Sequence, residues 1–428
     1  MTTPASIFSD LQARGLIAQT TNGIEAHLNE APRTLYCGFD PTADSLHIGS
    51  LIPLLTLRRF QQAGHTPIIL VGGATGMIGD PSFKAQERKL NDTATIRGWV
   101  EKLQTQTSRF VDFDTQPNAA RAVNNYDWTH TMDVLTFLRD VGKHFTVNNL
   151  IAKEAIKSRL ERDGAGISFT EFTYPLLQGL DFKHLIEHHT CTIQLGGSDQ
   201  WGNMTAGTEL IRKTLGAEAH VITVPLVTKA DGTKFGKTES GTIWLDATKT
   251  SPYAFYQFWL NTADADVEKF LLYFSFRSVE AIKTICEEHK ENPGLRKAQR
   301  MLASDVTCLV HGEDAFTTAE RISEYLFGSH WTDGEKKDLS AEDYAQLAQD
   351  GLPTTTSFTE GSIIEALTSA GLAQSNRQAR EFVENGAVTH NGESVQTTDH
   401  QLSTNNAAFG RYHLLRRGKK NYALLVHA

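Results

Sequence analysis

The chain has 428 residues, of which 40% are hydrophobic and 21% charged, with a formal net charge of −9 at pH 7. These values predict a soluble globular protein of two or three domains and exclude a uniformly basic coat, so any nucleic-acid surface must be local. The four cysteines are far apart and form no CxxC pair, which predicts reduced thiols rather than a disulfide framework or a zinc site. No apolar run reaches the roughly 20 residues of a membrane span, and the first residues lack a signal-peptide pattern. We therefore expect a cytoplasmic enzyme.

Residues from about 34 to 227 alternate β-rich runs with amphipathic helices. The run "TLYCGF" reads as a strand, residues 47–64 read as a helix, and "TPIILV" reads as the next strand. A strand–helix–strand unit of this length predicts a right-handed crossover and a parallel sheet. Ligands bind beyond the carboxyl ends of such strands, so we expect the polar loops that follow them to share one rim.

Two of these loops carry charged or polar side chains. The glycine-rich loop 72–79 does not fit GxGxxG, which argues against a dinucleotide site. An ordinary turn is the alternative, but Asp80 and Lys84 follow it and would place a carboxylate and an ammonium on the rim. His47 begins the first helix, where backbone N–H groups and the helix dipole favour an anion. A histidine at a helix start is, however, more often an ordinary surface residue.

A second candidate is a polar stripe within an apolar segment. Tyr174, Gln178 and Asp181 recur at i, i+4 and i+7 and therefore share one helix face. An ordinary solvated face is the alternative, but Leu177 and Leu180 beside this stripe favour the wall of a pocket.

The stretch "DGTKFGKTESG" at 231–241 nearly matches a phosphate-binding P-loop. It has three rather than four residues between Gly232 and Gly236, so the P-loop interpretation fails on spacing. Lys234 and Lys237 lie between glycines, which suits a moving loop that carries cations to a phosphate group. We expect this loop to be among the less ordered rim segments when no phosphate ligand is bound.

The pattern changes after the sheet region. We predict a Rossmann-like α/β domain with a parallel sheet over 1–248, an α-helical domain over 249–328, a polar linker over 329–360 and a small α+β domain over 361–428. In the last domain two short helices precede a hairpin around Asn391 and Gly392.

The C-terminal end is locally basic, with aromatic residues among the charges, as on nucleic-acid surfaces. A solvated charged face is the alternative. In a chain of net charge −9 this concentration favours contact with RNA or DNA. The basic residues are Arg377, Arg380, Arg411, Arg416, Arg417, Lys419 and Lys420.

Taken together, these motifs resemble the bacterial tyrosyl-tRNA synthetases, a family of class I aminoacyl-tRNA synthetases. The segment "YCGFDPTADSLHIGS" is similar to the family's HIGH segment, and "KFGKT" at 234–238 is similar to its KMSKS loop. Further similar blocks follow in the family's order, and the tail from about 362 is similar to an S4-type RNA-binding domain. These blocks are "VGGATGMIGDPS", "NNYDW", "GISFTEFTYPLLQGLD" and "GGSDQWGN".

The resemblance spans essentially the whole chain and implies a tyrosine–tRNA ligase. Such an enzyme joins L-tyrosine and ATP into tyrosyl-adenylate and pyrophosphate, then moves tyrosine to the 3′ end of tRNA(Tyr). It also implies Mg²⁺ bound through the ATP phosphates, no metal ligands from the protein, and a homodimer formed through "LTFLRDVGKHFTVN" at 135–148.

The resemblance assigns roles residue by residue. Tyr36 and Asp181 would bind the phenolic hydroxyl of tyrosine; Asp80, Tyr174 and Gln178 its ammonium group; Gln200 would lie near its carboxylate. Contacts to ATP would come from Gly38, Asp40, Thr42, His47, Gly49, Ser50, Gly197, Asp199 and Lys237. Catalytic contacts to the leaving pyrophosphate would come from His47, Lys84, Arg88, Lys234, Lys237 and Thr238. Contacts to tRNA would come from Arg377, Arg380, Arg416, Arg417, Lys419 and Lys420.

Two positions depart from the family pattern. Ser50 stands where the HIGH motif usually has its second histidine, and a serine hydroxyl reaches less far toward ATP. Leu180 stands where relatives commonly carry tyrosine. The alternative functions are a tryptophan–tRNA ligase, which the Tyr36/Asp181 pair disfavours, and a catalytically dead RNA-binding paralogue, which the retained Asp80 and lysine loop disfavour.

Overall fold

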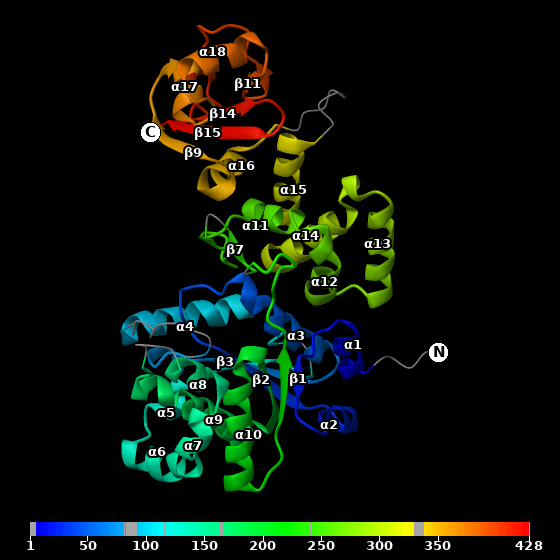
Figure 1. Cartoon of the computed structure of the whole chain (residues 1–428), viewed down its shortest axis with the longest axis vertical. Coiled ribbons are helices and arrows are strands. Elements are labelled where there is room, and N and C mark those ends of the chain that lie inside the picture. Colours follow the sequence, from blue (N-terminus) through cyan, green and yellow to red (C-terminus); the bar gives the residue numbers. More distant parts are fainter. Residues whose placement is uncertain are drawn as a thin grey trace. The chain divides into compact units, whose positions relative to one another are not determined.

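The structure is a computed structural model that describes residues 6–80, 82, 92–114, 117–161, 166–233, 235–238, 241–328 and 338–427. The chain forms two compact units, residues 1–245 with 264–293 and residues 246–263 with 294–428 (Figure 1). The helical stretch 249–328 is therefore shared between the units and does not stand as a compact body of its own. Among the described residues, no helix has the length and apolar character needed to span a membrane.

A six-stranded sheet in the order β1-β6-β5-β2-β3-β4 forms the centre of the first unit. Strands β2 to β6 run parallel, and the short β1 pairs antiparallel at one edge. The predicted parallel α/β sheet is thus confirmed. The strands are β1 Gln19–Thr20, β2 Thr34–Phe39, β3 Thr66–Val71, β4 Arg121–Asn124, β5 Cys191–Gly197 and β6 His220–Val224.

The order of these strands reverses between β2 and β5. From β2 the chain passes through helix α3 (Leu51–Gln62) outward to β3, and from β5 it passes through α10 (Trp201–Leu215) outward to β6 in the opposite direction. Right-handed crossovers of opposite direction place α3 and α10 on opposite faces of the sheet. Such a reversal opens a crevice at the carboxyl ends of the two strands.

Other helices complete the first unit. Helix α9 contacts α10 and β5, and Figure 1 shows α5 to α8 grouped beside it. The helices are α1 Ile7–Ala13, α2 Ile24–Glu30, α4 Thr93–Thr107, α5 Tyr126–Thr129, α6 Val134–Asp140, α7 Val147–Ile151, α8 Glu154–Leu160, α9 Phe169–His189, α12 Asp264–Phe274 and α13 Val279–Glu291. A short hairpin pairs β7 (Lys237–Thr238) with β8 (Gly241–Thr242).

The second unit combines three packed helices with a small α+β domain. Helices α11 (Pro252–Leu260), α14 (Lys297–His311) and α15 (Glu313–Phe327) contact one another. The α+β domain has a five-stranded sheet in the order β12-β11-β14-β15-β9. Its elements are α17 Ile363–Ser369, α18 Asn376–Glu384, β9 Thr354–Phe358, β10 Gly361–Ser362, β11 Val388–His390, β12 Glu393–Ser394, β13 Gln401–Leu402, β14 Tyr412–Arg417 and β15 Asn421–His427.

The hairpin predicted around Asn391 and Gly392 is present. These residues have φ of 46° and 84° and join β11 to β12, which is the geometry of a two-residue hairpin turn.

The predicted linker 329–360 differs from the structure in its described part. Residues 338–360 contain helix α16 (Ala341–Gln346), a π-helical turn (Leu347–Gly351) and strand β9. The acidic composition was misleading because Asp343 is fully buried and forms an ion pair of 2.7 Å with Arg321. The threonine-rich patch forms a strand because it pairs in parallel with β15.

Four histidines form a row through the interior of the α+β domain, which we call the histidine row. His390 Nδ1 lies 3.1 Å from His400 Nε2, and His390 Nε2 lies 2.8 Å from His413 Nδ1. His413 Nε2 lies 2.8 Å from His427 Nε2. His413 is fully buried, and His390 and His427 are nearly so. Burial lowers the pKa of His390 to about 4 and that of His413 to about 3, so these two rings are neutral at pH 7.

Candidate active site

A cavity of about 670 Å³ lies in the first unit, where the strand order reverses. The carboxyl ends of β2, β3, β5 and β6 contribute to its wall, as expected for a ligand site on a parallel sheet. Its size is that of a small-molecule site. Among the predicted residues it is lined by Tyr36, Gly38, Asp40, Thr42, His47, Gly49, Ser50, Asp80, Tyr174, Gln178, Asp181, Gly197, Asp199 and Gln200.

Two polar groups are buried at the strand end of this cavity. Tyr36, on β2, is 1% exposed, and its hydroxyl has no hydrogen-bond partner among the described residues. Asp181, on α9, is 3% exposed and accepts hydrogen bonds from Asn125 Nδ2 and Trp128 Nε1, each at 2.9 Å. An unpaired buried hydroxyl is costly, so this end of the cavity is suited to a ligand that carries its own hydroxyl group.

Burial also changes the acidity of Asp181. Removal from water raises the pKa of this carboxyl to about 7, although the hydrogen bonds from Asn125 and Trp128 act in the opposite direction. Burial first, and then the charge of Asp181, raise the pKa of the Tyr36 phenol well above its usual value. At neutral pH the pair therefore consists of a neutral phenol and a carboxyl group that is partly ionised.

A second group of side chains surrounds the middle of the cavity. Tyr174 donates to Asp40 Oδ2 at 2.8 Å, and Thr75 donates to Asp40 Oδ1 at 2.6 Å. The side-chain oxygen of Gln178 is buried without a partner among the described residues, which leaves an acceptor for a ligand. Gln200 donates to Asp80 Oδ2 at 2.8 Å. Acceptors outnumber donors here, which suits a cationic group such as an ammonium.

His47 lies at the rim, where the chain enters α3. Its Nδ1 accepts a hydrogen bond from the backbone N–H of Gly49 at 3.0 Å, so the neutral ring carries its proton on Nε2. A Cβ on Gly49 would lie 2.8 Å from the ring, so glycine is required for this approach. Ser50 closes the 3-10 turn Ile48–Ser50 through its N–H to the His47 carbonyl. The arrangement gives the cavity rim a fixed Nε2–H donor.

The lysine-bearing loop is described only in part. Lys84, Arg88 and Lys234 lie outside the described residues, as do the side chains of Lys237 and Thr238. The prediction that this loop is poorly ordered without ATP therefore stays a prediction. Within the described part, Phe235 lines the cavity and Gly236 is so close to Ile48 that a Cβ would lie 2.4 Å from its Cγ2.

The predicted RNA-contacting residues all belong to the second unit, whereas the residues that line the cavity belong to the first. Arg377 and Arg380 lie on α18 and are exposed, as are Lys419 and Lys420 in the turn between β14 and β15. Arg416 and Arg417 end β14 and are half-buried. The Arg417 guanidinium lies 5.1 Å from the centre of the Phe382 ring on α18. This contact places the end of β14 beside the helix that carries the other two arginines.

Three polar residues of the site were not predicted individually. Asn125 and Trp128 hold Asp181, and Thr75 holds Asp40 while accepting from Asn125 Nδ2 at 3.0 Å. The block "NNYDW" directly follows β4, so its position at a strand end on the same rim was the available signal. Sequence reasoning singled out the block but gave its side chains no role.

An exposed apolar surface lies on α6, α7 and the start of α9. We call it the apolar face; its exposed residues are Val134, Leu135, Leu138, Val147, Ile151 and Phe169, of which Leu135 is 74% and Phe169 75% exposed. Exposed large apolar side chains on neighbouring elements are typical of surfaces that bind another protein.

Comparisons with known proteins agree with this geometry. The family model for class I tRNA synthetases of the W and Y type matches residues 28–328, and a model for the SYY-like C-terminal domain of tyrosine–tRNA ligases matches residues 343–425. The tyrosine–tRNA ligase of Chromobacterium violaceum is 58% identical over 99% of both chains, and that of Aliivibrio fischeri is 56% identical over 100% of both. A crystal structure of a C-terminally truncated mitochondrial tyrosyl-tRNA synthetase from Aspergillus nidulans is 29% identical, with a TM-score of 0.69 over 76% of this chain and 95% of that chain.

Proposed function

The chain belongs to the tyrosine–tRNA ligases, within the class I tRNA synthetases of the W and Y type, and from this membership we propose how its cavity works. The proposed reaction joins L-tyrosine and ATP into tyrosyl-adenylate, releases pyrophosphate and transfers the tyrosyl group to the 3′ end of tRNA(Tyr). The observation that carries the proposal is the burial of Tyr36 and Asp181 side by side at one end of the cavity, which would suit a phenolic hydroxyl better than an apolar ring end.

In this proposal the amino acid lies with its ring toward β2. Its phenol donates to Asp181 and accepts from Tyr36, whose hydroxyl thereby gains a partner. Asp80, Tyr174 and Gln178 hold the ammonium group, and Gln200 lies near the carboxylate. Phenylalanine would leave the buried Tyr36 hydroxyl unpaired, at a cost of about 1–3 kcal/mol, and would offer Asp181 no hydroxyl hydrogen beyond its bonds from Asn125 and Trp128.

ATP would occupy the rim side of the cavity. Its contacts would come from the glycines at the strand ends and the polar residues around the start of α3. The proposed set is Gly38, Asp40, Thr42, His47, Gly49, Ser50, Gly197, Asp199 and Lys237, with Asp199 near the ribose. Gly197 supports close approach, since a Cβ there would lie 2.4 Å from Asp199 Oδ1. Mg²⁺ would arrive with ATP, bound through its phosphates as part of the substrate.

The first step needs positioning more than acid–base catalysis. The tyrosine carboxylate is already ionised at neutral pH and attacks the α-phosphorus in line, while negative charge grows on the pyrophosphate. His47 lines the cavity rim, and an Nε2–H donor there would meet that charge. Lys84, Arg88, Lys234, Lys237 and Thr238 are proposed to do the same from segments or side chains that are not described.

The second step needs a surface for tRNA. We propose that the basic residues of the α+β domain supply it, namely Arg377, Arg380, Arg416, Arg417, Lys419 and Lys420. Support comes from their shared location around α18 and the end of β14, and from the match of this domain to the family's C-terminal domain. The substrates are those of translation, so the proposed location is the cytoplasm.

The apolar face supports a homodimer in this proposal. It includes part of the segment 135–148 that the sequence analysis assigned to the interface, together with Val134, Ile151 and Phe169. Leu135→Glu should therefore shift the protein toward monomer in sedimentation or light-scattering measurements. Leu295→Glu is the matched control, because Leu295 is also an exposed leucine but lies in the 3-10 turn Pro293–Leu295, outside the apolar face.

The test of the activity is amino-acid-dependent exchange of labelled pyrophosphate into ATP, with tyrosine, tryptophan and phenylalanine compared. We expect exchange with tyrosine alone, whereas exchange with tryptophan would favour the alternative ligase and no exchange at all the inactive paralogue. Lys237→Ala should slow exchange while leaving tyrosine binding nearly intact, since its proposed contact forms as pyrophosphate leaves.

A further inference from the structure

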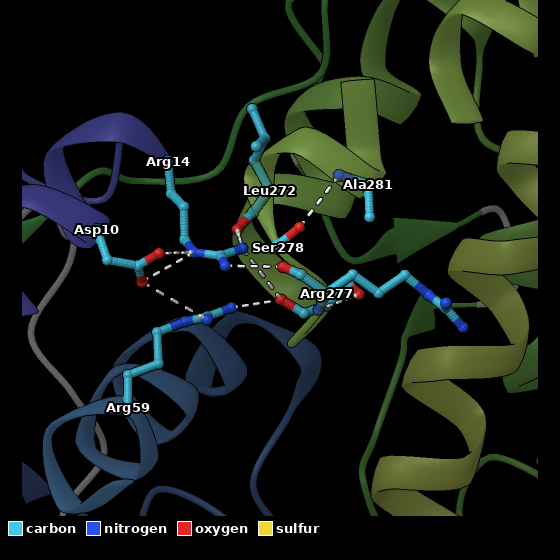
Figure 2. A network of polar contacts seen from close by, with 8 residues as sticks. Asp10, Arg14, Arg59, Leu272, Arg277, Ser278 and Ala281 are labelled. Carbon is cyan, nitrogen blue, oxygen red and sulfur yellow. Dashed lines mark hydrogen bonds and ion pairs between the residues drawn. The ribbon is translucent and has the colours of Figure 1, made fainter. Parts of the chain in front are cut away.

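Two buried arginines of the first unit share one carboxylate and also reach the end of a third helix (Figure 2). Arg14 on α1 is 4% exposed and Arg59 on α3 is 5% exposed. Arg14 Nε lies 2.9 Å from both carboxylate oxygens of Asp10, and Arg59 Nη1 lies 4.0 Å from Asp10 Oδ2. We call Asp10, Arg14 and Arg59 the arginine latch.

The other donors of the latch reach backbone carbonyls at the end of α12. Arg14 donates to the carbonyls of Leu272 and Ser275 at 3.4 Å and to that of Arg277 at 2.7 Å, and Arg59 also donates to the Ser275 carbonyl. The last carbonyls of a helix lack intrahelical partners and carry its negative dipole end. Two cations against one carboxylate are thus balanced by the C-terminal end of α12.

An aromatic contact holds the same turn. The Arg59 guanidinium lies 4.4 Å from the centre of the Phe276 ring, and Arg58 lies 5.0 Å from it. Burial lowers the pKa of Arg59 to about 9, so the group keeps its charge at neutral pH. None of the three latch residues lines the cavity.

Helix α12 in turn carries the segment that leads into the lysine-bearing loop. The Phe235 ring stacks on Phe274 with centres 5.6 Å apart and meets the edge of Phe270 at 5.1 Å. Both Asp266 oxygens accept from the Ala230 N–H, at 3.0 and 3.1 Å, and Lys269 donates to the Thr228 carbonyl at 2.7 Å. Thr228, Ala230 and Phe235 are therefore seated on α12, the first two by their backbone and the third by its ring.

The same segment also reaches the start of α3. The Gly236 carbonyl accepts from Ile243 N–H at 3.1 Å, and the Ile243 carbonyl accepts from Ile48 N–H at 3.0 Å, directly after His47. The described residues on either side of the lysine-bearing loop thus contact α12 through Thr228, Ala230 and Phe235, and the start of α3 through Ile243. The latch joins the C-terminal ends of these two helices, since Arg59 lies near the end of α3 and Ser275 follows Phe274, the residue on which Phe235 stacks.

We propose that the arginine latch is a positioning device for adenylate formation, holding α12 and the loop seated on it in register with His47 at the start of α3. Arg14 and Arg59 are its positioning residues. This inference rests on the proposed function, since it concerns the step in which the loop meets pyrophosphate. A buried ionic network is a weak source of stability compared with apolar packing, whereas small misplacements of a catalytic group cost large factors in rate.

The test compares Arg59→Met with Arg58→Met. Both remove one guanidinium from the Phe276 ring, but Arg59 alone of the two is bonded to the Ser275 carbonyl within the described residues. Arg59→Met should slow tyrosyl-adenylate formation about tenfold or more, with the tyrosine Kd within about twofold of the wild-type value. Transfer of tyrosine from preformed enzyme-bound adenylate to tRNA should stay within about twofold, since pyrophosphate has already left. Arg58→Met should resemble the wild type in all three.

A second readout does not depend on activity. Amide hydrogen exchange at Ala230, Phe235 and Gly236 should become faster in Arg59→Met and stay unchanged in Arg58→Met. Unchanged exchange and an unchanged rate of adenylate formation in Arg59→Met would overturn the proposal. A wild-type protein without tyrosine-dependent exchange of pyrophosphate would overturn the proposed function instead, and the amide measurement would still decide the latch.

Two milder variants keep the test decisive if Arg59→Met does not fold. Asp10→Asn changes a partly exposed member of the latch, 31% exposed, and keeps its size. Arg59→Lys keeps the charge but loses the planar fork that reaches the carbonyl and the ring together. Both should show the same pattern with a smaller loss, and a loss shared equally by adenylate formation and transfer would reduce the latch to a structural role.

Discussion

The cavity of the first unit and the histidine row of the second unit both bury titratable side chains, but they satisfy them in opposite ways. Around the cavity, the Tyr36 hydroxyl and the Gln178 oxygen are buried without partners among the described residues. In the histidine row, both ring nitrogens of His390 and of His413 meet another histidine. Buried polar groups that line a cavity without a protein partner can hydrogen-bond a ligand, whereas the histidines of the row already hydrogen-bond one another.

The direction of the pKa shifts teaches the same lesson. Burial raises the pKa of Asp181 to about 7 and lowers that of His413 to about 3, so each group is pushed toward its neutral form. In the cavity this cost can be recovered when a substrate binds. In the histidine row no ligand offsets the cost of burying a charged ring, so protonation destabilises the folded state and stability depends on pH.

The largest expected effect is on stability, from His413→Ala. Removing this fully buried ring leaves nitrogens of His390 and His427 unpaired and opens a hole, so the second unit should lose about 3 kcal/mol of unfolding free energy. Urea unfolding measures this, and tyrosine-dependent pyrophosphate exchange should not change. His400→Ala, at the half-exposed end of the row, should cost less than half as much; an equal cost would break the comparison.

The next effect concerns Asp181→Asn. Loss of the charged acceptor should weaken tyrosine binding about 100-fold while changing phenylalanine binding only slightly. Equilibrium dialysis with both amino acids measures the ratio. Asp44→Asn removes a carboxylate that pairs with Lys102 away from the cavity and serves as the control. Unchanged discrimination would show that the hydroxyl end of the cavity is misassigned.

Acid should act on the histidine row. Histidines in the unfolded chain bind protons near pH 6.5, whereas folded His390 and His413 do so near pH 4 and 3. Between these values the unfolded state holds more protons, so stability is complete above about pH 6.5 and falls as pH decreases. The loss between pH 7 and pH 5 should be on the order of 2 kcal/mol, followed by denaturant unfolding at each pH. In His413→Phe the slope should be clearly smaller, and an equal slope would place its origin elsewhere.

Tyr36→Phe should separate function from stability in the cavity. It removes a buried hydroxyl that has no partner, so the unfolding free energy should stay equal or rise by up to about 1 kcal/mol, while tyrosine affinity should fall about tenfold. Tyr422→Phe is the matched control, because that hydroxyl donates to the Leu326 carbonyl and its loss should lower stability. A destabilised Tyr36→Phe would mean that the hydroxyl is paired in the free protein.

The smallest effect is the pH dependence of tyrosine binding. Asp181 accepts from a phenol when ionised, and its pKa of about 7 means that the ionised fraction rises across neutral pH. Affinity for tyrosine should therefore increase about fourfold from pH 6.5 to pH 8, measured by equilibrium dialysis. Asp181→Asn should show no such increase, and a flat profile in the wild type would contradict the raised pKa.

Much of the first unit could be predicted because its signals are local. The strand–helix–strand pattern of β2, α3 and β3 follows from periodicity, and the 3.6-residue repeat placed Tyr174, Gln178 and Asp181 on one face of α9. The rule that parallel strands present ligands at their carboxyl ends then placed the loops on one rim. The role assigned to each side chain came from the family resemblance and stays a proposal.

Other features depend on distant pairings that one sequence does not contain. Asn125 and Trp128 reach Asp181 across more than 50 residues of chain. The histidines of the row have no periodic spacing, and the pairing of β11, β14 and β15 brings them together. The polar segment 338–360 was assigned to a linker because burial of Asp343 depends on Arg321. Composition indicates the average exposure of a segment, whereas the ion pair with Arg321 determines whether the single carboxylate of Asp343 is buried.

The histidine row has a direction. Each neutral ring carries one N–H, so His390 and His413 must each donate through one nitrogen and accept through the other, and all bonds of the row point the same way. An imidazolium at His390 or His413 donates from both of its nitrogens, so every bond on one side of it reverses. A second proton would bring two N–H groups face to face. The row therefore takes up a first proton by reversing bonds and a second only by losing one of them, which separates its two acid steps.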